Sequence, residues 1–211
     1  MRLDFVSDIT CPWCAIGLRA LELAIERTAD TASVELHLQP FELNPGLPAE
    51  GEPIADYAAR KYGATAGQLA ERQALIRGRA AELGLAFRPR THVYNTFDAH
   101  RLLHWAASQG RQLELKRALL RAYHERGENP ALPDVLLAAA AEAGLDRLAA
   151  GDVLGSGAHA DTIRITVRRW QRHGIDGVPA LVIDGQHLIQ GAQPVEVYEQ
   201  ALRRTALQRV A

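Results

Sequence analysis

The 211-residue chain has little of what stabilises small disulfide-rich proteins or anchors membrane proteins. It contains two cysteines and one methionine, and aromatic residues make up 6% of the sequence. No apolar run approaches the roughly 20 residues that an α-helix needs to cross a bilayer. The formal net charge is −1, from 24 basic and 25 acidic residues. A membrane span and a basic surface for nucleic acid or anionic lipid are therefore not expected.

The first residues also lack the features of a secretory signal peptide. Asp4 and Asp8 stand where the apolar segment of such a peptide would have to run. We therefore expect the protein to be cytoplasmic. Stable structural disulfides are uncommon in that compartment, so a pair of cysteines there is more often catalytic or metal-binding.

What the chain does contain is both cysteines in one short segment, CPWC, at residues 11–14. Two intervening residues hold the sulfurs close enough to form a disulfide, and the short ring makes that bond readily reversible. The preceding residues 2–8 (RLDFVSD) alternate apolar and polar side chains, which predicts a short strand. The residues after the pair place apolar side chains at helical spacing, and Pro12 suits the first turn of a helix.

The pattern therefore predicts a strand, a short loop and Cys11 at the N-terminus of a helix. Unpaired N–H groups and the positive end of the helix dipole favour a thiolate over a thiol at that position. Cys11, at the exposed end, is predicted to be the attacking sulfur. Cys14, one turn further in and more buried, is predicted to resolve the mixed disulfide.

Metal binding is the main alternative for two cysteines, and it is not favoured. A structural zinc site needs about four ligands, and the two thiols supply half of them. His100 and His104 are spaced i and i+4 on a helix face, which we interpret as an exposed polar face. Asp8 is either a turn or capping residue or, if it lies close to Cys11, a charge that opposes thiolate formation.

The rest of the chain alternates strands and helices in an α/β order. A second strand is predicted at 33–43, a helix at 157–175, a hairpin from 179–184 and 186–191 that turns at Gly185, and a last helix at 194–206. Between these parts, most of the predicted helices close on Gly. They cover residues 53–63, 66–84, 97–110, 113–127 and 133–144.

This order predicts an α/β, thioredoxin-like fold with a large α-helical domain inserted between the second strand and the later helix-hairpin-helix. Residues 1–48 are the expected N-terminal part of the thioredoxin-like domain. Residues 49–156 are the expected inserted helical domain. Residues 157–211 complete the thioredoxin-like domain.

Three stretches carry a resemblance to a known family. SDITCPWCAIG (7–17) resembles the active-site segment of the DsbA-like thioredoxin family and is similar to its FrnE-type cytoplasmic branch. GVPALVIDGQHLIQGAQP (177–194) resembles the segment with the cis-proline, the hairpin and the start of the last helix. NTFDAHRLLHWA (95–106) resembles a stretch of the inserted helices. The resemblance implies a dithiol–disulfide oxidoreductase or isomerase.

The resemblance also assigns site residues. It implies that Cys11 and Cys14 are the redox pair and that Pro179 follows a cis peptide bond. The residues expected to contact the substrate are Pro12, Trp13, Gly177 and Val178. Trp13 stands where the oxidising periplasmic members carry a His, and it cannot carry a positive charge. We therefore expect a redox potential between those of the periplasmic oxidant and thioredoxin, and reductase or isomerase activity.

The expected partners are disulfide-containing proteins or small thiols, with glutathione as a candidate thiol partner. No metal, organic cofactor, nucleic acid or membrane partner is expected, and the predicted assembly is a monomer or a homodimer. Two other function classes stay open. Related folds with the same insertion are glutathione-dependent transferases or 2-hydroxychromene-2-carboxylate isomerases, in which the position of Cys11 is often Ser. A redox-inactive binding or chaperone module would not need the cysteine pair.

Overall fold

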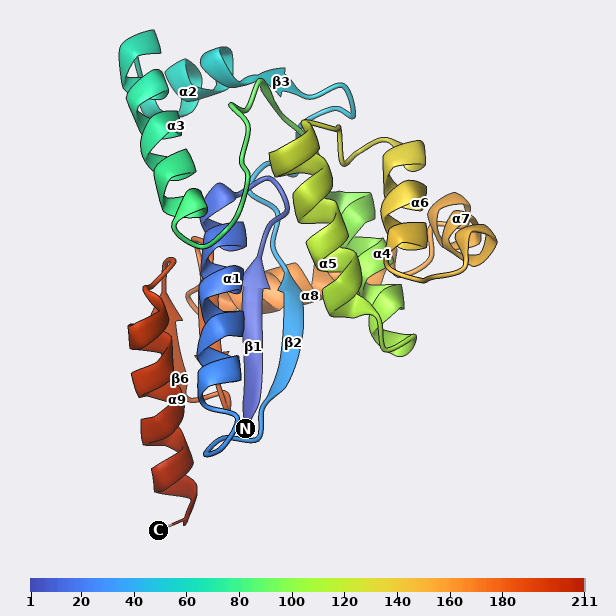
Figure 1. The fold of residues 1–211 in the computed structure, drawn as a ribbon. Helices are drawn as coiled ribbons and strands as arrows, with labels where there is room; N and C mark the ends of the chain where they lie inside the picture. Colours follow the sequence, from blue (N-terminus) through green and yellow to red (C-terminus); the bar gives the residue numbers. More distant parts are fainter. Residues whose placement is uncertain (211) are drawn as a thin grey trace.

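A computed structural model of the protein describes residues 1–210. Its central sheet has the strand order β2-β1-β5-β6. Strand β1 pairs in parallel with β2 and antiparallel with β5, which in turn pairs antiparallel with β6. The first and last parts of the chain therefore share one sheet (Figure 1). The strands are β1 (Arg2–Ser7), β2 (Glu35–Pro40), β5 (Ala180–Ile183) and β6 (His187–Gln190).

Helices cover both faces of this sheet. Leu3 and Phe5 of β1 are buried in one core with α1 (Pro12–Arg27) and α9 (Val195–Val210), which run side by side along the sheet (Figure 1). Val6, one residue on, faces the opposite side, where it packs with Trp170 of α8 (Ala160–Arg172). This alternation is the period of two that a strand buried on both faces shows. The predicted strand and the helix beginning at Pro12 are confirmed.

The hairpin after residue 179 follows from its turn residues. Asp184 has φ 50° and Gly185 has φ 70°, and Gln186 N–H donates to the Ile183 carbonyl at 3.0 Å. Two successive positive φ angles characterise the tight hairpin turn for which Asp-Gly is a preferred sequence. The turn predicted at Gly185 is therefore confirmed.

The segment between β2 and α8 is almost entirely helical. Leu102, Leu119 and Leu136, from three of its helices, share one apolar core. Together with the sheet, this arrangement confirms the predicted thioredoxin-like α/β fold with a helical insertion. The elements are β3 (Glu52–Pro53), α2 (Ile54–Tyr62), α3 (Ala66–Ala81), β4 (His92–Val93), α4 (Phe97–Ser108), α5 (Gln112–Arg121), the π-helix η1 (Ala122–Arg126), α6 (Pro133–Glu142) and α7 (Arg147–Gly155).

The insertion is not detached from the sheet. Leu113 and Leu120 of α5 pack with the same apolar core as Phe5. The side-chain amide of Gln112 both donates to and accepts from the backbone of Leu38 in β2, at 3.0 and 3.1 Å. Helix α5 therefore fixes the insertion against the strand edge. The division at residues 48 and 156 remains a prediction.

Several elements differ from the sequence expectations. Helix α7 was not expected, although Asp146 caps it by accepting from Ala149 N–H at 2.8 Å. Helix α8 begins later than residue 157 because Gly157 and His159 both have positive φ angles. The last helix continues past residue 206 to Val210. The β3–β4 pair consists of two residues per strand, too short to produce an alternating pattern in the sequence.

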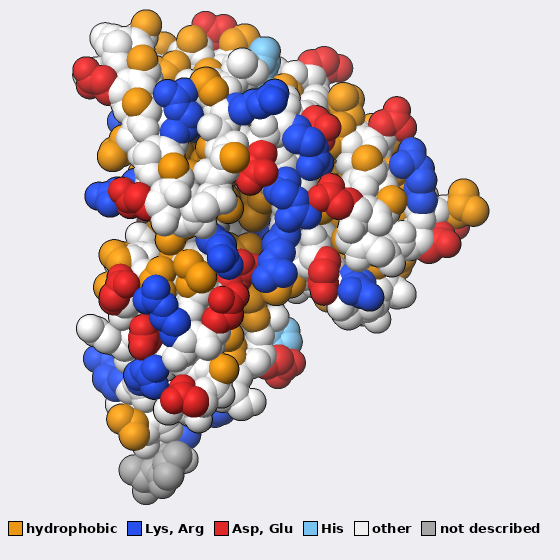
Figure 2. All heavy atoms as spheres, in the orientation of Figure 1, with side chains coloured by type: hydrophobic (Ala, Val, Ile, Leu, Met, Phe, Trp, Pro, Cys, Tyr) orange, Lys and Arg blue, Asp and Glu red, His pale blue; other side chains and the backbone are white. Residues whose placement is uncertain are grey.

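Within the described residues, no helix is both long and apolar enough to cross a membrane. Figure 2 shows Lys and Arg side chains gathered in a column over α5, with Asp and Glu side chains beside them. Arg117 pairs with Glu22 at 2.8 Å, and Arg121 pairs with Glu142 at 2.6 Å. These two arginines of α5 are therefore paired with carboxylates at the surface.

Candidate thiol–disulfide active site

The cysteine pair lies at the start of α1. Cys11 is the N-cap residue with an extended backbone (φ −84°, ψ 113°), and Pro12 occupies the first turn. The Cys11 carbonyl accepts hydrogen bonds from Cys14 N–H at 3.1 Å and from Ala15 N–H at 3.4 Å. A proline needs no hydrogen-bond partner at this position, because the first N–H groups of a helix have none. The sequence therefore closes the first turn directly behind Cys11.

Both thiols are free, and both are more buried than expected. Cys14 is 0% exposed, as its place one turn into the helix predicts. Cys11 is 5% exposed, so the expectation of an exposed end is wrong in degree. The helical insertion folds over the CPWC loop, and Cys11 borders a small cavity formed there. The position of Cys11 at the helix N-terminus could not by itself predict that the inserted helices would bury it.

The pKa values of the two thiols are shifted in opposite directions. A hydrogen bond from the Cys14 thiol lowers the pKa of Cys11, and the Cys14 and Trp13 N–H groups lower it further, against burial and the charge of Asp8. Burial raises the pKa of Cys14 well above its ordinary value, and its bond to Cys11 raises it further. The thiolate therefore forms on Cys11 first. The geometry gives Cys11 the properties of an attacking sulfur.

The loop before β5 faces Cys11. The Cys11 thiol contacts the Val178 carbonyl at 3.7 Å, and the Val178–Pro179 peptide bond is cis. Pro179 is buried behind Gly17, where an added Cβ would lie 3.2 Å from the Pro179 ring. Gly177, the residue before Val178, is exposed. Of the residues expected to contact the substrate, the structure thus brings Val178 directly to the Cys11 sulfur.

Asp8 lies behind the pair rather than in an ordinary turn. It is 1% exposed, its backbone N–H points at Cys14 Sγ at 3.4 Å, and its Oδ2 accepts from Leu43 N–H at 2.8 Å. Burial works to raise the pKa of Asp8, but the contact with His100 and the Leu43 N–H hold it below its ordinary value. Its negative charge in turn raises the pKa of Cys11. From the sequence, we expected Asp8 to oppose thiolate formation if it lay close to Cys11. It does lie close, and its charge has that effect.

We interpreted His100 and His104 as part of an exposed polar helix face, and for His100 this is wrong. It is 2% exposed, and its Nε2 lies 3.5 Å from Asp8 Oδ1. Burial lowers the pKa of His100, so the ring is neutral near pH 7. His104, one turn further along α4, is exposed as expected. A spacing of four residues cannot show that α4 turns its first histidine towards β1.

Lys116 of α5 completes this polar cluster and was missed entirely. The side chain is 1% exposed, and burial lowers its pKa while the charges of Cys14 and Asp8 raise it. The ammonium group therefore lies within electrostatic reach of both the Asp8 carboxylate and the Cys14 sulfur. Its sequence context, LELKRALL, is that of an ordinary amphipathic helix and carries no signal for this position.

The CPWC loop is held from the side of the insertion. His124 Nε2 lies 3.0 Å from the Ile9 carbonyl, and its ring stacks on Phe87 at 4.6 Å between centroids. Arg90 reaches the Thr10 carbonyl at 3.5 Å. Burial lowers the pKa of His124 to about 3, so it is neutral at physiological pH. These contacts orient the two residues that precede Cys11.

Two hollows flank the pair. A cavity of about 140 Å³ in front of Cys11 is walled by side chains of α2, α3 and the 84–96 loop, including Tyr57, Tyr62, Arg72 and Arg90. A wider groove of about 580 Å³ runs between α1, α3 and the start of α9. Trp13 borders both hollows and packs with Ile76 of α3, while Pro12 borders the first. The tyrosines and arginines of the first hollow have no motif by which sequence reasoning could have found them.

The described residues do not form a candidate metal-binding cluster. Among residues 1–210, no three His, Cys, Asp or Glu side chains are grouped in a way that could hold an ion. The arrangement can instead supply a stabilised thiolate, a protonated second thiol one turn away, and a backbone carbonyl beside the attacking sulfur. Those are the parts that disulfide exchange requires.

The fold and this site define a thioredoxin-fold protein with a redox-capable cysteine pair. The chain belongs to the DSBA-like thioredoxin domain family, whose profile matches residues 2–203. The predicted family is thereby confirmed.

Three solved structures illustrate the range of this fold. A probable DsbA oxidoreductase from Streptomyces coelicolor is 34% identical, with 99% of this chain and 90% of that chain covered and a TM-score of 0.90. A 2-hydroxychromene-2-carboxylate isomerase is 18% identical over 100% and 98% of the two chains, with a TM-score of 0.70. The cytosolic disulfide reductase DsbM from Pseudomonas aeruginosa, solved with glutathione, is 19% identical over 100% and 99%, with a TM-score of 0.65.

Proposed function

We propose that the protein is a thiol–disulfide oxidoreductase that reduces or isomerises disulfides, with Cys11 attacking and Cys14 resolving. The observation that carries the proposal is the opposite acidity of two thiols one turn apart. A nucleophilic thiolate and a protonated reserve thiol are what a two-step exchange needs. Family membership supports oxidoreductase activity in general.

In the first step, the Cys11 thiolate attacks one sulfur of a substrate disulfide. A Cys11–substrate disulfide forms, and the other substrate sulfur leaves as a thiolate that takes up a proton. Once the Cys11 charge is consumed, the like charge that disfavours ionisation of Cys14 is gone. Cys14 then loses its proton and attacks Cys11 Sγ. The products are a reduced substrate and an oxidised Cys11–Cys14 pair.

Two electrons must return to the pair before the next reduction. A small thiol such as glutathione supplies them by the same exchange in reverse, and two thiols become one disulfide. Glutathione bound to the structurally similar DsbM supports this choice. The arginines Arg72 and Arg90 at the cavity in front of Cys11 could hold the carboxylates of such a tripeptide.

An extended protein substrate would use the wider groove. The Val178 carbonyl beside Cys11, together with Gly177, offers backbone to pair with a substrate strand. Trp13 separates the groove from the small cavity and would form part of the rim against which the substrate packs. Disulfide-containing proteins and small thiols are therefore the proposed partners.

The test is insulin disulfide reduction by the full-length protein with glutathione as reductant, compared with glutathione conjugation of a chlorinated arene. We expect insulin reduction that is lost in Cys11→Ser and in Cys14→Ser. Conjugation of the arene without insulin reduction would favour the transferase alternative. Activity with 2-hydroxychromene-2-carboxylate that survives Cys14→Ser would favour the isomerase alternative, whose fold this chain shares.

Three finer expectations remain predictions. They are membership of the FrnE-type branch, a cytoplasmic location, and a monomeric or homodimeric assembly. Operation without a metal or organic cofactor belongs to the same proposal. Its direct check is that chelator treatment leaves insulin reduction unchanged.

A further inference from the structure

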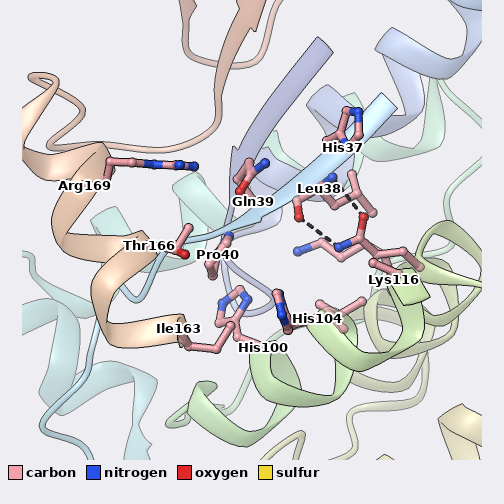
Figure 3. Close-up of a pocket in the computed structure, with 13 residues that line it drawn as sticks. His37, Leu38, Gln39, Pro40, His100, His104, Lys116, Ile163, Thr166 and Arg169 are labelled. Atoms are coloured by element: carbon pink, nitrogen blue, oxygen red, sulfur yellow. Dashed lines mark hydrogen bonds between the residues drawn. The ribbon is translucent and has the colours of Figure 1, made fainter. Parts of the chain in front are cut away.

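A second cavity lies away from the thiols, between β2, α4, α5 and α8 (Figure 3). It has a volume of about 260 Å³ and shares no lining residue with the cavity in front of Cys11. Ligand pockets for drug-sized molecules span roughly 300–1,000 Å³, so this one suits a smaller molecule.

The ionisable side chains that line this cavity are basic: Lys116, Arg169, His37, His100 and His104. Two of them contact carboxylates outside the lining, His37 with Glu35 at 2.9 Å and His100 with Asp8 at 3.5 Å. Figure 3 shows Lys116, His100, His104 and Arg169 around the same space, from α5, α4 and α8. In a chain with nearly balanced charge, such a lining favours an anion.

The deepest of these groups are not satisfied by the protein. Lys116 is 1% exposed, and no hydrogen bond to another described residue contributes to its environment. His100 Nε2 is buried and makes no hydrogen bond of good geometry. The charge of Asp8 acts on the Lys116 ammonium group, but no described oxygen atom accepts a hydrogen bond from it. A buried ammonium group without an acceptor is costly, and oxygen atoms of a bound anion would offset that cost.

The two amide side chains of the cavity are already occupied. Gln112 bonds the backbone of Leu38, and Gln39 donates to Asp4 at 2.7 Å. Arg169 is exposed on α8 at the rim, where its guanidinium lies 5.1 Å from the centroid of the Trp170 ring. Lys116 at the base and Arg169 at the rim thus supply cationic donors, and His100 lies beside Asp8 at the base.

We propose that this cavity binds a small oxyanion, a carboxylate or a phosphate, between Lys116 and His100 at the base and Arg169 at the rim. The assignment does not depend on disulfide exchange, because no thiol lines the cavity. A planar guanidinium can hold either anion with two parallel hydrogen bonds, so both belong to the same chemistry.

Calorimetric titration of the full-length protein with inorganic phosphate and, separately, with succinate tests the proposal at ionic strength held constant with sodium chloride. We expect saturable binding of at least one probe. Loss of a charge-assisted contact in Arg169→Ala or Lys116→Met should weaken it by about tenfold or more. Binding of phosphate alone identifies a phosphate site, and binding of succinate identifies a carboxylate site.

Matched variants keep the test decisive. Arg168→Ala removes the neighbouring exposed arginine of α8, which does not line the cavity, and should leave the affinity unchanged. Because Lys116→Met could unfold the chain, Arg169→Ala serves as the surface variant that keeps the core intact. Cys11→Ser should bind the anion normally, which separates this site from the thiol site. Absence of saturable binding, or equal affinity in Arg169→Ala and Arg168→Ala, would overturn the proposal.

Discussion

Cys11 and Cys14 lie three residues apart in the sequence, yet their local environments differ. In front of Cys11 are a backbone carbonyl, tyrosine rings, the exposed Arg72 and the half-buried Arg90, around a hollow. Behind Cys14 is a buried cluster of ionisable side chains, Asp8, His100 and Lys116, the last two of which also line the second cavity.

This difference shows how one helical turn can hold two kinds of thiol. The front offers a reacting molecule room and hydrogen bonds. The rear sets the electrostatic potential, because charges in a low-dielectric interior act strongly on one another. The front is built by the CPWC loop, the loop before β5 and the helices α2 and α3. The rear joins β1 to the inserted helices α4 and α5.

The largest effect should come from removing the sulfurs one at a time. Cys11→Ser removes the attacking thiolate, so insulin reduction should fall to the background rate. Cys14→Ser keeps the attacker and loses the resolver, so a covalent Cys11–substrate disulfide should accumulate. Mass spectrometry of the quenched reaction reports that species. A mixed disulfide that forms on Cys14 instead would reverse the assigned roles.

Next in size is the acid stability that depends on His124 at the back of the loop. The pKa of His124 is about 3 in the folded protein, against 6.5 ordinarily. Between pH 3 and pH 6.5, His124 therefore binds a proton in the unfolded chain but not in the folded chain. The contribution of His124 to the free energy of unfolding should therefore be fully present above pH 6.5 and should decrease as the pH falls towards 3. A pKa difference of one corresponds to about 1.4 kcal/mol, so the loss amounts to several kcal/mol.

Urea unfolding of the parent and of His124→Gln across that pH range measures this contribution. The variant should be less stable at pH 7, because the contact with the Ile9 carbonyl changes, but its stability should fall less steeply with acid. His187→Gln, on the exposed side of β6, is the control and should keep the parental slope. An unchanged slope in His124→Gln would refute the assignment.

A smaller effect sharpens the contrast between front and rear. Iodoacetamide at mildly acidic pH should modify Cys11 faster than Cys14, because the pKa of Cys11 is lowered and that of Cys14 is raised. Asp8→Asn removes a negative charge that raises the pKa of Cys11, so the midpoint of its alkylation should move to lower pH. Asp4→Asn makes the same change four residues earlier, on β1, where Asp4 pairs with Arg2, and should leave the midpoint in place.

The smallest effect concerns Trp13, which belongs to the front. Trp13 offers no positive charge to the Cys11 thiolate, so we expect a potential between about −270 mV for thioredoxin and about −120 mV for the periplasmic oxidant. Trp13→His should shift the potential towards the more oxidising value. Titration against reduced and oxidised glutathione measures both proteins. A parent potential as high as that of the periplasmic oxidant would remove the basis for reductase activity.

Local patterns in the sequence were enough to predict several elements of the fold. Alternation in residues 2–8, Pro12 in a first turn and Asp184-Gly185 in a hairpin each express the conformational preferences of a few neighbouring residues. The order of such elements was sufficient to predict the α/β fold with its helical insertion. The CPWC spacing was sufficient to select the cysteine pair, because two intervening residues bring the sulfurs within one helical turn.

The surroundings of the two sulfurs depend on how distant parts of the chain pack together. His100 and Lys116 lie on amphipathic helices about 90 residues or more from Cys11, and their patterns are those of ordinary exposed positions. Packing of α4 and α5 against β1 buries both side chains and brings them to Asp8. Burial and charge interactions between residues distant in the chain set the acidity of each thiol, and they depend on distances that no local pattern records.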